Sequence, residues 1–360
     1  MSLRDMAVRL PWPIRQGLRY AYGTLPPRFR VGRVFWETYR FLQESQWWSG
    51  ERLREHQARE LRGLLRHAYL YVPYYRRLFD ERGLKPDDIR DPSDLRLLPL
   101  LTKEIIRENM RDLMATNFPA RCFSKVTTGG SSGTPLVLYH HRNYTDEKEA
   151  AFVAALWDRV GFRYGVDKRL SLMGSIVNGK GFVEYNPMSR ELRCSAYWMD
   201  DAHLKAYFQE MIRRNVRFIH GHVSSVCTFA QFIVREGKRY DLKAVLGVAE
   251  KAYPFQRKLV GDAFGTRLFS HYGHSERAVM AGECESSSFY HVFPEYGCLE
   301  LIDGDGNVVS APGEEGEIVA TGFNNYAFPF IRYRTGDIAR YACGPCACGR
   351  EYPLLEDIEG

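Results

Sequence analysis

Thr127-Thr128-Gly129-Gly130-Ser131-Ser132-Gly133-Thr134-Pro135 is the stretch around which this chain is organised. Its three glycines leave the backbone free to turn amide groups inward, and the Ser and Thr hydroxyls add donors without bulk. Such a nest of donors suits a polyphosphate, although a Ser/Gly-rich surface turn has the same composition. Strand-like segments flank the loop and Gly-Lys-Ser/Thr is missing, so it is neither a Walker A loop nor a dinucleotide-binding loop.

The remainder of the chain predicts an α/β protein. Helical patterns at 51–70, after Pro73 and from Thr102 dominate residues 1–120. Within residues 121–276, strand-like and helix-like segments alternate, which predicts a largely parallel sheet covered by helices. From Gly297 onward, short strands with glycine turns predict an antiparallel sheet or small barrel. We therefore expect three parts: 1–120, 121–276 and 277–360.

Composition and charge narrow the class of protein. Neither a run of about 18 apolar residues nor an apolar signal core is present, and eight cysteines without such a signal indicate a cytoplasmic, reducing location. Of 50 Lys and Arg and 44 Asp and Glu residues, seven arginines and Asp5 fall within residues 1–33, which leaves 43 of each sign. Residues 34–360 therefore carry no net charge, which argues against nucleic acid as a partner. The arginine-rich head is either an exposed segment packed loosely on the protein or a peripheral contact for an anionic membrane.

Two further stretches lie where an α/β sheet binds its ligands. Tyr272-Gly273-His274-Ser275-Glu276 follows a predicted strand, and there a tyrosine can stack on a purine while a glutamate holds Mg²⁺ against phosphate oxygens. Tyr333-Arg334-Thr335-Gly336-Asp337 follows the strand-like segment 328–332, and an acidic side chain at a tight turn can accept both hydroxyls of a ribose. Taken singly, each stretch also fits a strand end or an ordinary Gly-Asp turn.

Together and in this order, the three stretches resemble the phosphate loop, the adenine-stacking segment and the ribose segment of adenylate-forming enzymes. Val72-Pro73-Tyr74-Tyr75-Arg76 and Leu98-Pro99-Leu100-Leu101-Thr102-Lys103 resemble the branch of phenylacetate–coenzyme A ligases and capsular-polysaccharide proteins. The resemblance implies the N-terminal core fold of that superfamily. It also implies an ATP-dependent ligase that forms an acyl-adenylate from a small carboxylic acid and passes the acyl group to coenzyme A or another acceptor. The competing interpretation is a non-catalytic adenine-nucleotide-binding or scaffold protein of a polysaccharide assembly.

The resemblance assigns roles to individual residues. Catalytic roles fall to Thr128, Thr134 and Glu276, and Glu276 is the expected magnesium ligand. The carboxylic acid would meet Gly174, His220 and His222, although such histidines are more often structural. ATP would contact residues of the loop and of three strand ends, namely Thr128, Gly129, Gly130, Ser131, Ser132, Gly133, Thr134, Ala249, Glu250, Tyr272, Gly273 and Asp337.

Two features depart from the family pattern. Leu136 stands where the family usually has a lysine. The sequence ends at Gly360, before the hinge and the small C-terminal lid domain that the resemblance implies, so the lid is expected to be absent. We expect a core without its lid to bind nucleotide but to catalyse the complete reaction only weakly.

A cysteine-rich stretch, Cys343-Gly344-Pro345-Cys346-Ala347-Cys348, favours a metal over disulfides in a reducing compartment. Cys284 and His291 are its best partners in the sequence. The resemblance implies a closed structural zinc site made of Cys284, His291, Cys346 and Cys348, with Cys343 as a substitute candidate. Reduced turn cysteines without a metal are the alternative.

Overall fold

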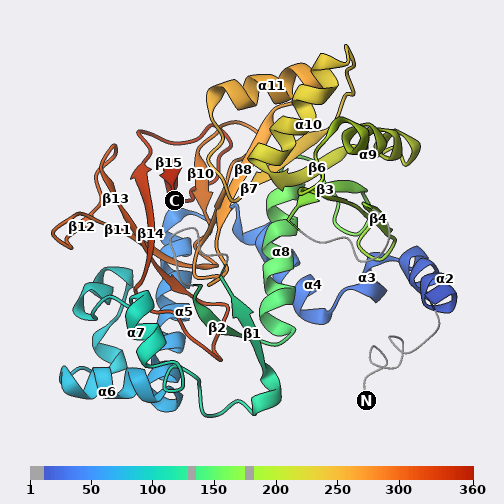
Figure 1. The fold of residues 1–360 in the computed structure, drawn as a ribbon. Helices are drawn as coiled ribbons and strands as arrows, with labels where there is room; N and C mark the ends of the chain where they lie inside the picture. The colour runs from blue at the N-terminus through green and yellow to red at the C-terminus, as the bar shows by residue number, and fades with distance from the viewer. Residues whose placement is uncertain (1–11, 129–134, 175–181) are drawn as a thin grey trace. The chain divides into compact units, whose positions relative to one another are not determined.

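The computed structural model describes residues 12–128, 135–174 and 182–360 (Figure 1). Its contacts divide the chain into two compact units: unit 1 is Met1–Trp36 with Trp157–Ser270, and unit 2 is Glu37–Leu156 with His271–Gly360. The chain passes from one unit to the other within three elements, α4 (Arg33–Ser45), α8 (Tyr144–Asp158) and β8 (Leu268–Gly273). The units therefore interleave along the chain, and the division into three consecutive parts stays a prediction.

Unit 1 is built on a parallel sheet with one antiparallel edge strand. Strands β3, β5, β6 and β7 are parallel, whereas β4 pairs antiparallel with β5. Helix α10 packs on β3, β6 and β7 and also contacts α9 and α11 (Figure 1). The predicted alternation of strands and helices is thus confirmed. The elements are β3 (Arg169–Met173), β4 (Val183–Asn186), β5 (Glu191–Ser195), α9 (Asp201–Arg213), β6 (Phe218–His222), α10 (Val223–Arg235), β7 (Ala244–Val248) and α11 (Pro254–Phe264), preceded by α2 (Trp12–Thr24) and α3 (Pro27–Arg30).

Unit 2 contains the antiparallel sheet that the glycine-turn pattern predicted. Its strands follow the order β12-β11-β13-β14-β15-β10-β9-β8, and each neighbouring pair is antiparallel. Among the described residues, no pairing between β12 and β8 closes this sheet. Its strands after β8 are β9 (Met280–Gly282), β10 (Tyr290–Val292), β11 (Gly297–Ile302), β12 (Val308–Val309), β13 (Glu315–Gly322), β14 (Tyr333–Tyr341) and β15 (Leu354–Glu359).

The helices of unit 2 cover this sheet with one apolar face. The five residues predicted for the buried side of α5, Leu53, Leu61, Leu64, Leu65 and Ala68, are all buried. Ser49 begins α5 by accepting a hydrogen bond from the Arg52 amide, which satisfies a donor of the first turn. None of the described helices combines the length and the apolar character needed to cross a membrane. The remaining elements are α5 (Gly50–Tyr71), α6 (Pro73–Glu81), η1 (Pro86–Asp88), η2 (Pro92–Leu97), α7 (Lys103–Glu108) and η3 (Ala120–Cys122).

The donor-rich loop connects two strands, as predicted. β1 (Phe123–Thr127) and β2 (Val137–His141) form an antiparallel hairpin with Thr127 opposite Val137. A hairpin holds both ends of its loop at a fixed separation. The loop is therefore anchored to a sheet and does not open a helix.

The segment before Asp337 corrects one prediction. Phe328–Arg332 was expected to be a strand, but it is an irregular connection and β14 begins at Tyr333. Asp337 accordingly lies inside a strand and not at a tight turn after one. Phe328, Phe330 and Ile331 are buried, so these apolar residues pack into the core without forming a ladder.

Candidate active site

Two hydrogen bonds close the base of the donor-rich loop. The Thr128 amide donates to the Leu136 carbonyl over 2.9 Å, and the Leu136 amide donates to the Thr128 hydroxyl over 3.0 Å. The Thr128 hydroxyl therefore accepts a hydrogen bond from Leu136, and its own O–H can still donate to another group. Leu136 is buried in the apolar core of unit 2, which suits a leucine where the family usually has a lysine. The predicted residues Gly129, Gly130, Ser131, Ser132, Gly133 and Thr134 lie outside the described residues.

A histidine of β2 joins this hairpin to the segment that carries Glu276. His140 donates from Nε2 to the Ser275 carbonyl over 2.9 Å. Asn325 holds the same strand, since its amide group donates to the Tyr139 carbonyl and accepts from the His141 amide. Two of the three predicted stretches are therefore brought together within unit 2.

Glu276 is a buried carboxylate with a partner at each oxygen. Tyr333 donates its hydroxyl to Oε1 over 2.6 Å, and His274 donates from Nδ1 to Oε2 over 3.0 Å. Burial alone would raise the pKa of Glu276, but the hydrogen bond and charge of His274 and the Tyr333 hydroxyl lower it to about 2. The carboxylate is therefore ionised at neutral pH, as a magnesium ligand must be.

The other ring nitrogen of His274, Nε2, is buried and makes no hydrogen bond among the described residues. The rings of Tyr272 and Tyr333 each have their centroid 6.1 Å from that of His274. Buried polar atoms normally find a partner, so an unpaired nitrogen between two aromatic rings suits contact with a bound polar molecule.

The third predicted stretch meets the second through one short hydrogen bond. Tyr272 donates its hydroxyl to Asp337 Oδ2 over 2.5 Å, and burial together with the Asp337 charge raises the pKa of Tyr272. A bulge in β14 presents Asp337, because residues 335–337 together lie opposite Ile318 alone. Gly336 adopts φ +86° at this bulge, a conformation that glycine accepts without strain.

The other predicted nucleotide residues, Ala249 and Glu250, belong to unit 1. The Glu250 carboxylate accepts from the Ser224 amide over 2.6 Å and from the Ser224 hydroxyl over 2.8 Å. It therefore caps the first turn of α10, where a negative charge is favourable. Ala249 adopts φ +64° beside it. A role for these two residues at an adenine stays a prediction.

The residues predicted to line an acid pocket also lie in unit 1. The His220 ring lies 4.7 Å from that of Trp157, and His222 precedes the first turn of α10. At Gly174, an added Cβ would lie 3.1 Å from the hydroxyl of the exposed Tyr197 side chain, which would have to shift slightly to admit it. Most of the predicted pocket segment, residues 175–181, lies outside the described residues.

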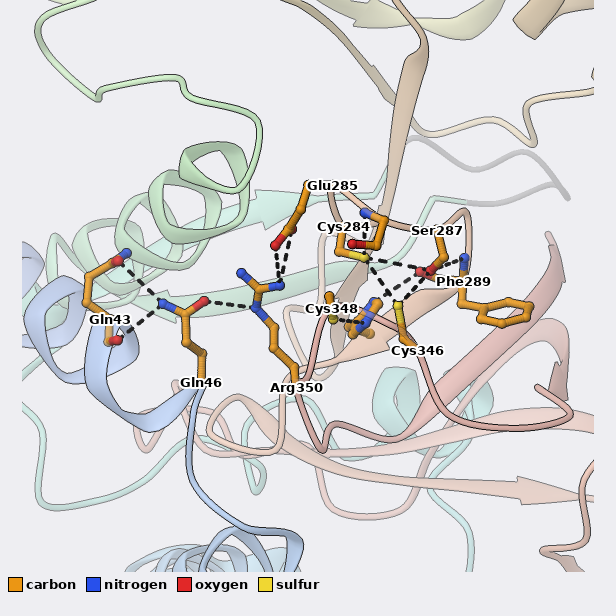
Figure 2. Close-up of polar contacts among 11 residues, drawn as sticks. Gln43, Gln46, Cys284, Glu285, Ser287, Phe289, Cys346, Cys348 and Arg350 are labelled. Carbon is orange, nitrogen blue, oxygen red and sulfur yellow. Dashed lines mark hydrogen bonds and ion pairs between the residues drawn. The ribbon is translucent and has the colours of Figure 1, made fainter.

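The predicted metal ligands form a cluster in unit 2. The ligand atoms of Cys284, His291, Cys346 and Cys348 all lie within 4.8 Å of one another (Figure 2). The Cys284 and Cys346 sulfurs are 3.5 Å apart, and His291 Nε2 is 3.2 Å from the Cys348 sulfur. A tetrahedral zinc ion with bonds of about 2.3 Å to sulfur places its ligands about 3.8 Å apart. Cys343, the residue predicted as a possible replacement ligand, is exposed and lies outside the cluster.

The surroundings of the cluster also suit a metal. His291 donates from Nδ1 to the Phe289 carbonyl over 3.1 Å, which fixes the tautomer that leaves Nε2 as the ligand atom. Burial alone would raise the pKa of the Cys284 thiol, but the adjacent His291 ring and a hydrogen bond from the Ser286 amide lower it to about 5. Beside the cluster, Arg350 joins Glu285 to Gln46 (Figure 2). The donor set therefore fits a structural zinc ion.

The sequence did not assign roles to several residues that shape this site. Tyr333 and His274 were quoted within motifs but received no role. The Tyr333 contact with Glu276 joins two segments that are distant in the chain, whereas His274 reaches Glu276 from two residues away. Arg277 follows Glu276 and pairs with Asp146 and Glu149 of α8, which lie more than 120 residues earlier. The only sequence signals for this pairing were the two acidic residues of the predicted helix and the arginine that directly follows Glu276.

Comparison with known proteins relates the chain to one superfamily. No family model matches it. A phenylacetate–coenzyme A ligase of Pseudomonas putida is 29% identical over 302 residues, which cover 82% of this chain and 68% of that protein. Protein CapK of Staphylococcus aureus is 25% identical over 252 residues, which cover 68% of this chain and 54% of that protein.

Solved structures show the same fold. An open conformation of 2-hydroxyisobutyryl-CoA ligase, in complex with 2-HIB-AMP and CoA, matches with a TM-score of 0.69 at 18% sequence identity. The match covers 87% of this chain and 77% of that chain. The chain is thus similar in sequence to phenylacetate–coenzyme A ligases and to CapK, and it shares its fold with the 2-hydroxyisobutyryl-CoA ligase structure.

Proposed function

We propose that this chain activates a carboxylic acid with ATP. The carboxylate attacks the α-phosphate, the bond from that phosphorus to the pyrophosphate oxygen breaks, and acyl-adenylate and pyrophosphate form. The thiol of coenzyme A then attacks the acyl carbon, loses its proton and displaces AMP. The names of the relatives support this sequence of steps, as does the adenylate and CoA complex of the structural neighbour.

The observation that carries the proposal is the meeting of three distant stretches within unit 2. The His140 bond to Ser275 joins the donor-rich hairpin to the Glu276 segment, and the Tyr272 bond to Asp337 joins that segment to the bulge of β14. Phosphate, metal and ribose groups of one nucleotide need such a set of neighbours. Positioning and charge neutralisation are the main contributions that a protein makes to phosphoryl chemistry.

We assign the following roles to these residues. Thr128, with Gly129, Gly130, Ser131, Ser132, Gly133 and Thr134, would hold the phosphates. Tyr272 and Gly273 would lie against the adenine, with Ala249 and Glu250, while Asp337 would accept from the ribose hydroxyls. Glu276 would hold Mg²⁺, which when bound offsets phosphate charge, and His274 Nε2 would contact the nucleotide or the acid.

Zinc is the second metal in the proposal. Cys284, His291, Cys346 and Cys348 would all be ligands, and four protein ligands leave no position for a reacting water. The ion would therefore stabilise unit 2 and take no part in the chemistry. Its expected effect is on folding, because metal binding energy is also folding energy.

The acid is the least defined substrate. Gly174, His220 and His222 are its proposed neighbours, and the aromatic contact between His220 and Trp157 suits an aryl group. Phenylacetate is the first acid to try, since the relatives carry its name.

Acid-dependent exchange of labelled pyrophosphate into ATP tests the proposal. The assay uses this chain joined to the small C-terminal lid domain that the family resemblance implies. A panel of carboxylates that begins with phenylacetate should then give exchange with at least one acid and none without acid. Binding of ATP without exchange for any acid would contradict the proposal. That outcome would favour the alternative, a nucleotide-binding scaffold of a polysaccharide assembly.

A further inference from the structure

The N-terminal helices of unit 1 carry a dense run of exposed apolar side chains. Within residues 14–29, six large apolar residues are between 37% and 60% exposed: Ile14, Leu18, Tyr20, Tyr22, Leu25 and Phe29. Elsewhere in the described part of the chain, such residues occur singly or in pairs. Scattered exposed apolar residues are ordinary, but a contiguous group indicates an interaction surface.

The spacing of these residues defines one face. Ile14, Leu18 and Tyr22 follow one another at intervals of four residues, which places them along one side of α2. Leu25 lies just after the end of α2, and Phe29 of α3 is the most exposed of the group. We call Ile14, Leu18, Tyr22, Leu25 and Phe29 the outer apolar face.

The opposite side of α2 is attached to unit 1 through small and polar residues. At Gly23, an added Cβ would lie only 2.7 Å from the Pro187 carbonyl oxygen, so the helix is closely docked there. Arg19 pairs with Glu184 over 3.5 Å. An ordinary surface helix buries its apolar side and exposes its polar side. α2 does the reverse, and its docking therefore leaves the outer apolar face available.

The neighbouring surface extends this face. Arg30 donates to the Met188 carbonyl over 2.6 Å and to the Gly165 carbonyl over 2.5 Å, which holds α3 beside these two segments. Met188 is 41% exposed, and Val166, next to Gly165, is 40% exposed. The apolar surface is thus wider than one helix.

The positive charge of residues 6–36 indicates what kind of partner this face would bind. Residues 6–36 contain six arginines and no acidic residue. Arg28 is exposed, and its guanidinium lies 4.8 Å from the Phe29 ring centroid. A partner must therefore be apolar and negatively charged at once. A second copy would bring arginines against arginines, which disfavours a symmetric dimer through this face.

We propose that α2 and α3 rest on the surface of an anionic lipid bilayer. The outer apolar face would enter the boundary between head groups and acyl chains, and the exposed Arg28 beside Phe29 would lie among the lipid phosphates, as cationic side chains of other interfacial helices do. Such a contact would hold unit 1 at the membrane surface. It involves none of the residues proposed to bind the nucleotide.

Vesicle co-sedimentation tests this proposal. The protein should sediment with vesicles of phosphatidylcholine mixed with phosphatidylglycerol, bind phosphatidylcholine alone much more weakly, and be released by salt. The double variant Leu18→Glu with Phe29→Glu should bind at least about tenfold more weakly, because it places charge where apolar groups must be buried. Both side chains are exposed, so its melting temperature should not change.

Ile212→Glu is the matched control. Ile212 is 48% exposed on α9 of the same unit but lies outside the outer apolar face, so this variant should bind as the wild type does. Equal binding by the wild type and the double variant, or no binding to anionic vesicles, would overturn the proposal. A dimer in solution that the double variant abolishes would also overturn it, by assigning the face to a second copy. Calorimetric ATP binding by the same variants separates this outcome from the nucleotide site.

Discussion

Arg277 is the residue whose conformation most directly fixes the Glu276 segment. It is a non-glycine residue with φ +54°, a conformation that costs an arginine free energy and persists only where contacts enforce it. Its guanidinium supplies these contacts, at 2.8 Å from Asp146 and 3.9 Å from Glu149. Glu149 also accepts a hydrogen bond from Tyr296 over 2.5 Å, and burial raises its pKa. Arg277 is therefore a positioning residue for Glu276.

Substituting Arg277 should destabilise unit 2. Arg277→Ala would leave the half-buried Glu149 without its cation, so we expect the free energy of unfolding to fall by about 2 kcal/mol, between the values for exposed and buried ion pairs. Urea unfolding measures this loss. Arg340→Ala is the control, since it removes an exposed pair with Glu315 and should cost less than about 1 kcal/mol.

The positioning role has its own readout. Arg277→Lys keeps the charge and should recover part of the stability and of the Mg²⁺ dependence of ATP binding. A stable Arg277→Lys protein with unchanged metal dependence, together with an Arg277→Ala protein that unfolds like the wild type, would refute the role.

His140 makes stability depend on pH. Burial first, and then the charge of Arg277, lower the pKa of His140 to about 4, against about 6.5 in an unfolded chain. As pH falls from 6.5 towards 4, the unfolded chain takes up this proton and the folded chain does not, so stability declines. At pH 5 the contribution of His140 to this decline is about 2 kcal/mol.

The variant His140→Gln should reduce that dependence. Urea unfolding at pH 7 and pH 5 should show a smaller loss of stability for the variant than for the wild type. Equal losses for the two proteins would show that His140 is not held neutral.

At the scale of elements, the cysteine cluster joins two connections of one sheet. Cys284 follows β9 and His291 lies in β10, whereas Cys346 and Cys348 lie between β14 and β15. β10 lies between β9 and β15 in the sheet, so a metal here would hold adjacent strands together.

We expect one equivalent of zinc by elemental analysis of protein purified without a chelator. Cys346→Ser and Cys348→Ser should lose the metal and lower the melting temperature by roughly 5–10 °C, the shift produced by the loss of a few kcal/mol. Cys343→Ser is the control and should keep both metal and stability, because Cys343 lies outside the cluster. Metal-free wild-type protein with the stability of the variants would rule out the site.

Local sequence patterns predicted some helices and strands correctly but did not predict others. The apolar stripe of α5 and the strands beside the donor-rich loop are encoded by neighbouring residues, and both predictions are confirmed. Phe328–Arg332 has the composition of a strand, yet its apolar residues enter the core singly. β4 and β5 are short, and the antiparallel pairing that defines β4 depends on residues outside its own segment.

The site was predictable in its parts and not in its assembly. The four metal-ligand candidates and the roles of the three motifs could be named because these stretches resemble those of adenylate-forming enzymes, and the structure gathers the four ligand candidates. The contact of Tyr272 with Asp337 depends on how the strands β8 to β15 are arranged in the sheet. It also depends on a bulge in β14, which includes Asp337. Neither the strand order nor the bulge has a signature in a short segment.

At the scale of the whole molecule, the central claim is a magnesium-dependent adenine-nucleotide site built on Glu276. Calorimetric titration of ATP, with and without Mg²⁺, into the wild type and Glu276→Gln tests it most directly. Glu315→Gln is the control, because Glu315 is an exposed carboxylate at the start of β13. We predict that Mg²⁺ strengthens ATP binding to the wild type and the control. Glu276→Gln should lose this gain, about tenfold in affinity. No ATP binding by the wild type, or the same gain in Glu276→Gln, would contradict the account.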